Sequence, residues 1–198
     1  MIITTRLRLV GVTAVALLVS TVEARAQERL HVAGGDVTVV CPLTVGGSFE
    51  ARTKALSGDV GPAPQQRGTV GGALLVKLDT LETGIGLRDH HLRDNYLEVG
   101  KGDGYNVATL ENIQLEKSDG KSAFKGTLLL HGQRRQVSGM STIHRNSDGT
   151  IRVDAEFPLK VSEFAIPKPT YLGVGVHDEI RVKVAFNAAP MSTSVSTR

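Results

Sequence analysis

The sequence is poor in cysteine and in aromatic residues: its 198 residues include one cysteine, no tryptophan, three tyrosines and five phenylalanines. A single cysteine excludes a fold held together by internal disulfides. The 22 glycines follow no three-residue repeat and only one long apolar run is present, which excludes collagen-like and polytopic membrane proteins. Apolar residues still make up 40% of the chain, enough for the hydrophobic core of one domain, or at most two.

The long apolar run lies at the N-terminus. Arg6 and Arg8 come before the apolar residues 9–19, and the small-x-small triplet Ala24-Arg25-Ala26 follows them. This pattern predicts a signal peptide over residues 1–26, because the apolar run is shorter than the ~20 residues that a membrane-spanning helix needs. We therefore expect a mature protein that begins near residue 27 and is periplasmic or secreted.

Little net charge remains once this segment is removed. Residues 1–26 hold three of the 23 basic residues and one of the 20 acidic residues, which leaves the mature chain a formal charge of +1. The remaining lysines and arginines do not gather on one face, and no aromatic platform accompanies them. We therefore expect no nucleic acid partner.

Most of the remaining chain alternates apolar and polar residues with a period of two. Residues 151–162 give the clearest case, with Ile151 and Val153 on one face and Arg152 and Asp154 on the other. Such alternation is typical of antiparallel strands that have one buried face and one solvated face. On this pattern we predict eight strands, which cover residues 36–43, 48–57, 73–80, 105–117, 123–131, 136–145, 151–162 and 180–187.

Three segments depart from the alternation. Residues 86–97 contain no β-branched residue and place Leu87, His91 and Tyr96 within about one helical face, which predicts a short helix between the third and fourth strands. Residues 58–72 are rich in glycine and proline and are predicted to form a mobile loop. The aperiodic end of the chain, from residue 188, is predicted to fray, so the domain is assigned to residues 27–190 and a flexible tail to residues 191–198.

Long antiparallel strands with a single helix fit either a closed barrel or a two-sheet sandwich. The barrel is favoured, because closure removes the exposed edges that strands of about eight to thirteen residues would otherwise present. The predicted fold is therefore all-β: an eight-stranded antiparallel barrel with its apolar face inward and one short helix inserted between strands 3 and 4. A barrel of this size can hold one small ligand.

The apolar strand positions are the candidate lining of the barrel. With so few large aromatic side chains to fill it, the barrel would leave an elongated apolar cavity, where a hydrocarbon chain gains about 0.8 kcal/mol per buried CH₂. Periodicity does not distinguish such a hollow barrel from one that its own side chains fill. The residues predicted to contact a lipid tail are Leu74, Val76, Leu78, Val153, Phe157, Leu159, Val182, Val184 and Phe186.

Catalytic and metal-binding patterns are weak. The sequence has no G-x-S-x-G elbow and no phosphate-binding loop, and its carboxylates are scattered. His90 and His91 are neighbours, so on a helix they point about 100° apart and cannot both face one metal ion. Cys41 lies in a predicted strand, where it is expected to pack as a small hydrophobic residue. We expect no catalysis, no metal and no cofactor; the alternative is a periplasmic haem, redox or stress-response protein that uses His91 or Cys41.

Three motifs follow one another over about residues 80–186. The first holds Thr83-Gly84, Arg88-Asp89 and His91-Leu92, the second is GTLLLHG at residues 126–132, and the third is FAIP at 164–167 with GVHDEI at 175–180. In this order they resemble the TG…RD-x-HL signature, the G-x-L-x-L-H-G hairpin and the closing strands of the exported YceI-like family. Ordered matches of this extent are not expected by chance.

This resemblance implies a periplasmic or secreted lipocalin-like barrel that binds a long isoprenoid or another amphiphilic lipid and catalyses no reaction. The residues that would then contact the ligand headgroup or form a lid at the barrel mouth are Arg88, Asp89, His91 and Tyr96. The expected partner is a hydrophobic small molecule, whether isoprenoid, other lipid or quinone-like. Transient membrane contact is compatible with this role, and a monomer or homodimer is expected.

The chain also departs from the family pattern. Where the family commonly has two phenylalanines after the helix and a proline before the next strand, this chain has Tyr96-Leu97 and Tyr105-Asn106, and Leu110 replaces an aromatic residue. Leucine in place of aromatic wall residues is expected to change the width of the cavity and hence the length or headgroup of the ligand. A barrel with a filled interior, which binds only a partner or is purely structural, is the third hypothesis.

Overall fold

The computed structural model describes residues 29–63, 68–171 and 173–191. The predicted signal peptide and the tail residues 192–198 lie outside the described residues. The strands are β1 (Leu30–Val32), β2 (Gly35–Pro42), β3 (Ser48–Thr53), β4 (Leu56–Pro62), β5 (Thr69–Lys77), β6 (Val107–Leu115), β7 (Gly120–Leu130), β8 (Gln133–Arg145), β9 (Ile151–Lys160), β10 (Thr170–Tyr171), β11 (Val174–Gly175) and β12 (Glu179–Pro190). The helical elements are the helix α1 (Gly86–His91), the π-helical η2 (Leu92–Tyr96) and the 3₁₀ turns η1 (Leu78–Thr80), η3 (Val99–Lys101) and η4 (Val161–Phe164).

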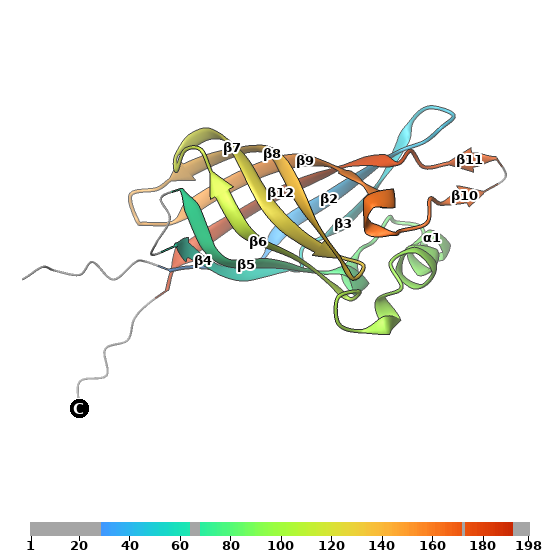
Figure 1. The fold of residues 1–198 in the computed structure, drawn as a ribbon, viewed down its shortest axis with the longest axis horizontal. Helices are drawn as coiled ribbons and strands as arrows, with labels where there is room; N and C mark the ends of the chain where they lie inside the picture. The colour runs from blue at the N-terminus through green and yellow to red at the C-terminus, as the bar shows by residue number, and fades with distance from the viewer. Residues whose placement is uncertain (1–28, 64–67, 172, 192–198) are drawn as a thin grey trace, which may run out of the picture.

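Ten of these strands form one antiparallel sheet that closes on itself (Figure 1). Their order is β1-β4-β5-β6-β7-β8-β9-β12-β2-β3, and β1 also pairs with β12, where Leu30 lies opposite Pro190. The eight strands β1, β4 to β9 and β12 thus complete a ring, which confirms the predicted antiparallel barrel. Within the described residues, β10 and β11 form a separate two-stranded sheet.

The first predicted strand corresponds to β2, the second is divided between β3 and β4, and the short strand β1 was not predicted. Residues 33–34 separate β1 from β2, and residues 54–55 separate β3 from β4. Strands β1 and β2 both pair with β12, so together they follow the line of one bent strand. Strand β4 pairs with β1 and β3 pairs with β2, so β3 and β4 form a second bent strand beside the first. The predicted helix position between strands 3 and 4 is therefore corrected: α1 follows β5 and precedes β6.

Two segments that were predicted to be irregular contain residues that the structure places in strands. Strand β4 extends to Pro62 and β5 begins at Thr69, so most of the predicted loop at residues 58–72 is paired; residues 64–67 lie outside the described ranges. Gly72 has a φ of 93°, and a Cβ at this position would collide with the backbone oxygen of Asp59. Glycine here allows the two strands to approach closely at an irregularity of the sheet. Strand β12 likewise continues to Pro190, so residues 188–190 belong to the barrel.

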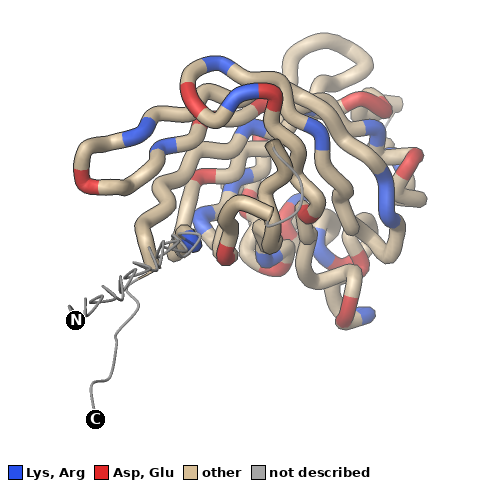
Figure 2. The backbone as a smooth tube through the Cα atoms, turned by 60° about the vertical axis from the view of Figure 1, so that its left-hand side comes forward, with Lys and Arg blue, Asp and Glu red and all other residues tan. Residues whose placement is uncertain are grey.

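The register of the strands sends alternate side chains inward. Val182 of β12 lies opposite Phe157 of β9, and Val184 lies opposite Ala155, while Lys183 between them is exposed. The inward residues form two hydrophobic clusters, a larger one around Phe164 and a smaller one around Val32. On the outer surface lysine and arginine are interspersed with aspartate and glutamate, and neither sign dominates the view of Figure 2.

Residues 78–101, here called the helical segment, lie across one end of the barrel between β5 and β6 (Figure 1). The segment is joined to β3 by two backbone hydrogen bonds between Arg52 and Glu82, with N–O distances of 2.8 and 2.9 Å. Neither α1 nor η2 contains a fully buried residue. No helix in the described part of the chain is long and apolar enough to cross a bilayer.

Candidate functional site: an apolar barrel interior

Two apolar cavities lie inside the barrel. The first, here called the helix-end cavity, has a volume of about 180 Å³ and lies beneath the helical segment. The second, the far-end cavity, has a volume of about 440 Å³ and reaches β1 and the end of β12. Both are lined by Leu74, Leu110, Phe157 and Val184, so the two cavities adjoin at this layer. The interior of the barrel is therefore only partly filled by its own side chains.

All nine residues predicted to contact a lipid tail line these cavities. Those at the helix-end cavity are Leu74, Val76, Leu78, Phe157, Leu159, Val182 and Val184. Those at the far-end cavity are Leu74, Val153, Phe157, Val184 and Phe186. They come from the three strands β5, β9 and β12 and from the turn η1, and their contact with a ligand remains a prediction.

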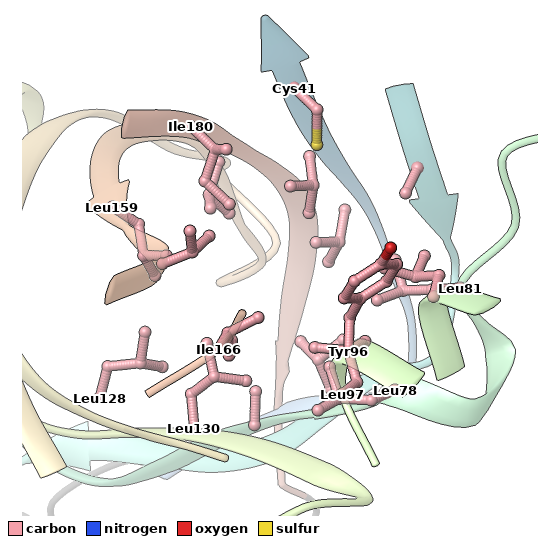
Figure 3. Close-up of a pocket in the computed structure, with 18 of the residues that line it drawn as sticks. Cys41, Leu78, Leu81, Tyr96, Leu97, Leu128, Leu130, Leu159, Ile166 and Ile180 are labelled. Atoms are coloured by element: carbon pink, nitrogen blue, oxygen red, sulfur yellow. The ribbon is translucent and has the colours of Figure 1, made fainter. Parts of the chain in front are cut away.

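Other lining residues were not among the predicted site residues. Leu128 and Leu130 alternate along β7, so their periodicity could have identified them. Leu81 and Ile166 lie outside the strands, where no periodicity marks them. Figure 3 shows these side chains converging with Cys41, Leu78, Tyr96, Leu97, Leu159 and Ile180 around the helix-end cavity.

Two polar side-chain groups reach the helix-end cavity, the hydroxyl of Tyr96 and the thiol of Cys41 (Figure 3). No hydrogen bond joins the Tyr96 hydroxyl to another of the described residues, so its donor and acceptor are free for a ligand. Burial raises the pKa of Cys41 to about 11, although the nearby Arg88 guanidinium opposes the shift. The thiol is therefore neutral near pH 7 and a poor nucleophile or metal ligand.

Arg88 and Asp89, which were predicted to lie at the mouth, contact the loop before α1. The Thr83 hydroxyl accepts a hydrogen bond from Arg88 Nε at 2.9 Å and donates one to the Asp89 carboxylate. The Thr83 backbone N–H also donates to Asp89, with an N–O distance of 2.6 Å, and the hydrogen bonds from Thr83 lower the pKa of that carboxyl. The Arg88 guanidinium lies 4.4 Å from the ring centroid of Phe49, a lining residue. These two residues thus fix the start of the helix beside the cavity.

The other two predicted mouth residues differ in position. Tyr96 lines the helix-end cavity, whereas His91 is exposed and contacts the ring of His90, with 6.1 Å between centroids. His90 in turn pairs with Asp94 at 2.6 Å. Among the described residues, no three histidine, cysteine, aspartate or glutamate side chains are grouped closely enough to hold a metal ion.

His131 connects the barrel wall to both turns at the mouth. His131 and Gly132 form the two-residue turn that joins β7 to β8, with φ values of 50° and 70°. The side chain of His131 is buried. Its Nδ1 lies 3.0 Å from the carbonyl oxygen of Phe164 in η4, and its Nε2 lies 3.0 Å from a carboxylate oxygen of Glu98 beside η3. Both partners are acceptors and a neutral imidazole has one N–H, so both hydrogen bonds form only when the ring is protonated.

The closed antiparallel barrel, with its apolar interior and the helical segment at one end, defines a small lipocalin-like barrel, a fold that can enclose a ligand. The chain belongs to the YceI-like family, because the YceI-like domain matches residues 12–188. The matched range begins well before residue 80, where the first of the three sequence motifs lies. No curated protein matches the chain.

Solved structures show the same fold. The crystal structure of BcnA from Burkholderia cenocepacia has a TM-score of 0.65 and 19% identity, covering 78% of this chain and 96% of that one. A polyisoprenoid-binding domain from Saccharophagus degradans, implicated in plant cell wall breakdown, has a TM-score of 0.62 and 17% identity, with coverages of 83% and 99%. The YceI protein of Campylobacter jejuni has a TM-score of 0.55 and 19% identity, with coverages of 74% and 86%.

Proposed function

We propose that this protein is exported and binds a long isoprenoid, or a similar amphiphilic lipid, in the barrel interior without catalysing a reaction. The observation that carries the proposal is the largely apolar lining of two adjoining cavities; the polar side chains of the far-end cavity are Thr69, Glu116, Ser118, Ser141 and Arg145. A polyisoprenoid is the ligand class named for the Saccharophagus degradans domain of the same fold, which supports this choice. Export is supported by the signal peptide predicted over residues 1–26.

The sizes of the cavities favour an elongated ligand. Pockets for small ligands usually measure about 300–1,000 Å³, so the helix-end cavity of about 180 Å³ is too small to hold such a ligand alone. The far-end cavity of about 440 Å³ lies in that range and adjoins it through Leu74, Leu110, Phe157 and Val184. A hydrocarbon chain that occupies both cavities would be buried over most of its length, and burial favours binding by about 0.8 kcal/mol for each CH₂ group.

The polar groups suggest the orientation of this ligand. The hydroxyl of Tyr96 can hydrogen-bond a headgroup at the helix end, while the tail extends between β5, β9 and β12 toward the far end. The neutral thiol of Cys41 adds a weak donor in the same cavity. Within the described ranges no hydrogen bond joins either group to a general base, and the proposal involves no bond formation.

Native mass spectrometry of the mature protein, combined with titration of a fluorescent isoprenoid probe, tests the proposal. We expect a co-purified lipid or saturable uptake of the probe. Val182→Asp places a carboxylate in the helix-end cavity and should reduce uptake by at least tenfold, because burial of an unpaired charge is costly. Leu75→Asp, on the exposed outer face of β5, is the matched control and should bind normally.

Circular dichroism separates lost binding from lost folding. If Val182→Asp does not fold, Val182→Thr, which has nearly the same shape but adds a hydroxyl, provides the second variant and should weaken binding several-fold. A protein that neither retains a lipid nor takes up the probe would exclude the proposed function. Undiminished uptake by a folded Val182→Asp variant would show that the ligand binds elsewhere.

A further inference from the structure

At the helix end, part of the enclosure around the cavity is helical segment rather than sheet. Strand β3 stands last in the order of the sheet, and among the strands of the described chain it pairs with β2 alone. Along its other edge, its backbone hydrogen bonds within the described residues are those between Arg52 and Glu82. Residues 85–96, here called the flap, follow this link and supply Leu92 and Tyr96 to the cavity lining. The flap therefore covers the cavity beside a free strand edge.

Both ends of the flap are fixed to the barrel wall. Before the flap, Glu82 is bonded to β3. After the flap, Leu97 is buried in the core, and the Glu98 carboxylate lies 3.0 Å from Nε2 of His131 in the turn between β7 and β8. The backbone is left-handed at both boundaries, where Gly84 and Glu98 have φ values of 78° and 50°. Such residues at the ends of an element are where a hinge absorbs a change of direction.

The flap itself is held mainly by contacts within its own segment. In the described part of the chain, the hydrogen bonds and ion pairs of residues 85–96 all end within residues 81–97. The Thr83 hydroxyl joins two of them, because it accepts a hydrogen bond from Arg88 and donates one to Asp89. The flap meets the wall through the Arg88 guanidinium over the Phe49 ring and through apolar packing of η2. Few interactions must break for it to leave the wall.

The proposed orientation of the ligand requires an entrance at this end. A ligand whose headgroup lies at the Tyr96 hydroxyl, with its tail toward the far end, enters tail-first only from the helix end. Entry from the far end would carry the polar headgroup past the apolar junction at Leu74 and Phe157, which is costly. Every residue that lines the helix-end cavity is buried or half-buried, so a part of the protein must move to admit a ligand there.

We propose that the flap is a gate, which swings away from β3 about its two fixed ends, admits the ligand beside Phe49 and closes over it. Closure brings the Tyr96 hydroxyl to the headgroup. This inference rests on the proposed function and adds the route by which the ligand enters and leaves. Because Glu82 and Leu97 keep their contacts with the wall, the gate can open while the barrel stays folded.

Cys41 provides a probe of the gate that needs no ligand. It is the one cysteine of the chain, and its thiol points into the helix-end cavity (Figure 3). The folded protein should therefore react with N-ethylmaleimide only when the gate opens. Thr83→Val keeps the shape of the side chain but removes the hydroxyl that joins Arg88 to Asp89, so it should raise the labelling rate about tenfold.

Thr150→Val is the matched control. Thr150 donates hydrogen bonds from its backbone N–H and its hydroxyl to Asp148, as Thr83 does to Asp89, but it lies in the turn between β8 and β9. Its labelling rate should stay within about twofold of that of the unmodified protein. Equal labelling rates for Thr83→Val and Thr150→Val would overturn the gate.

Arg88→Gln is the second variant, for use if circular dichroism shows that Thr83→Val does not fold. It removes the contact with Phe49. The charge of Arg88 lowers the pKa of the Cys41 thiol, so loss of that charge alone would slow the reaction, whereas opening of the gate accelerates it. Faster labelling of Arg88→Gln would support the gate, and labelling at the unmodified rate or below it would overturn the gate.

Stopped-flow exchange of the fluorescent isoprenoid probe separates the gate from the proposed function. An easier opening lowers the barrier in both directions, so Thr83→Val should speed uptake and release equally, by about tenfold, and leave the dissociation constant within about twofold. A weaker dissociation constant with unchanged uptake would assign Thr83 a structural role and overturn the gate. Failure of the unmodified protein to take up the probe would overturn the proposed function, whereas labelling of Cys41 would still report whether the flap opens.

Discussion

The barrel wall and the helical segment are stabilised by different interactions. Along the wall, apolar residues such as Phe157 and Leu159 are buried while their neighbours Glu156 and Lys160 are exposed. In the helical segment Leu78, Leu81 and Leu97 are buried in the core. Between Leu81 and Leu97, α1 and η2 bury no residue completely and are held by hydrogen bonds such as those between Thr83 and Asp89. Wall stability should therefore depend on buried apolar area, whereas the part of the helical segment between these leucines should open locally when a few polar contacts are lost.

The largest effect is expected in the wall. Phe157 is buried between the two cavities, and its ring packs edge-on against Phe124 with centroids 5.9 Å apart. Phe157→Ala should lower the free energy of unfolding by about 3–5 kcal/mol, because it removes a buried ring and enlarges the cavity. Urea denaturation followed by circular dichroism measures this change. Leu75→Ala, at a 37% exposed position of the same wall, should change it by less than about 1 kcal/mol, and equal losses would contradict the comparison.

A smaller effect is expected where the two regions meet, at His131. His131→Phe keeps an aromatic ring but removes both ring nitrogens, so we expect the free energy of unfolding to fall by about 1–3 kcal/mol and hydrogen exchange to become faster in the turns at residues 98–101 and 161–164. Urea denaturation and hydrogen exchange measure these changes. Unchanged exchange in both turns would mean that the contacts of His131 with Phe164 and Glu98 do not hold them in place.

Acidification should loosen the helical segment before the wall. Hydrogen bonds from Thr83 lower the pKa of Asp89 from its ordinary 3.8, and the ammonium of Lys101 lowers that of Glu98 from 4.5. Because these pKa values are lower in the folded protein, the stabilisation is present above the ordinary values and is lost as the pH falls through the lowered ones. Protection from hydrogen exchange at residues 83–101, corrected for intrinsic rates, should decline below about pH 4 while β9 and β12 stay protected.

Asp89→Asn is the matched control for this pH dependence. The amide keeps the size of the carboxylate but cannot ionise, so protection around Thr83 should be lower at neutral pH and change less on acidification. Simultaneous loss of protection in the helical segment and the wall would show that the two regions unfold as one unit. The helical segment would then not be less stable than the barrel wall.

The sequence allowed the wall to be predicted far better than the mouth. Alternation located the long strands and all nine predicted tail residues because each inward position repeats every second residue. The three-residue β1 and the close approach at Gly72 depend on partners far along the chain, so no local pattern reveals them. In the helical segment the sequence shows which side chains are charged, but it does not show whether they face a ligand or their own loop. In the structure Arg88 and Asp89 both contact Thr83, in the loop before α1.

The smallest effect is expected at Leu110, where the wall sets the junction of the two cavities. Leu110 lines both cavities and packs over Gly126, at which a Cβ would lie 2.9 Å from its Cδ1. Leu110→Phe should narrow the junction, so that about one CH₂ of a long tail is displaced from it. Each CH₂ that is excluded loses about 0.8 kcal/mol, a factor of about four in affinity, whereas a ligand short enough to stay at one end should bind nearly as before.

Competition between farnesol and a longer polyprenol for the fluorescent probe measures this preference. Leu110→Phe should shift it toward farnesol by several-fold and Leu110→Ala toward the longer chain, while Leu75→Phe on the outer wall should leave it unchanged. The same shift for Leu110→Phe and Leu110→Ala would contradict a junction at this position. The tail would then end within one cavity, and the residues that line the other cavity would not contact the ligand.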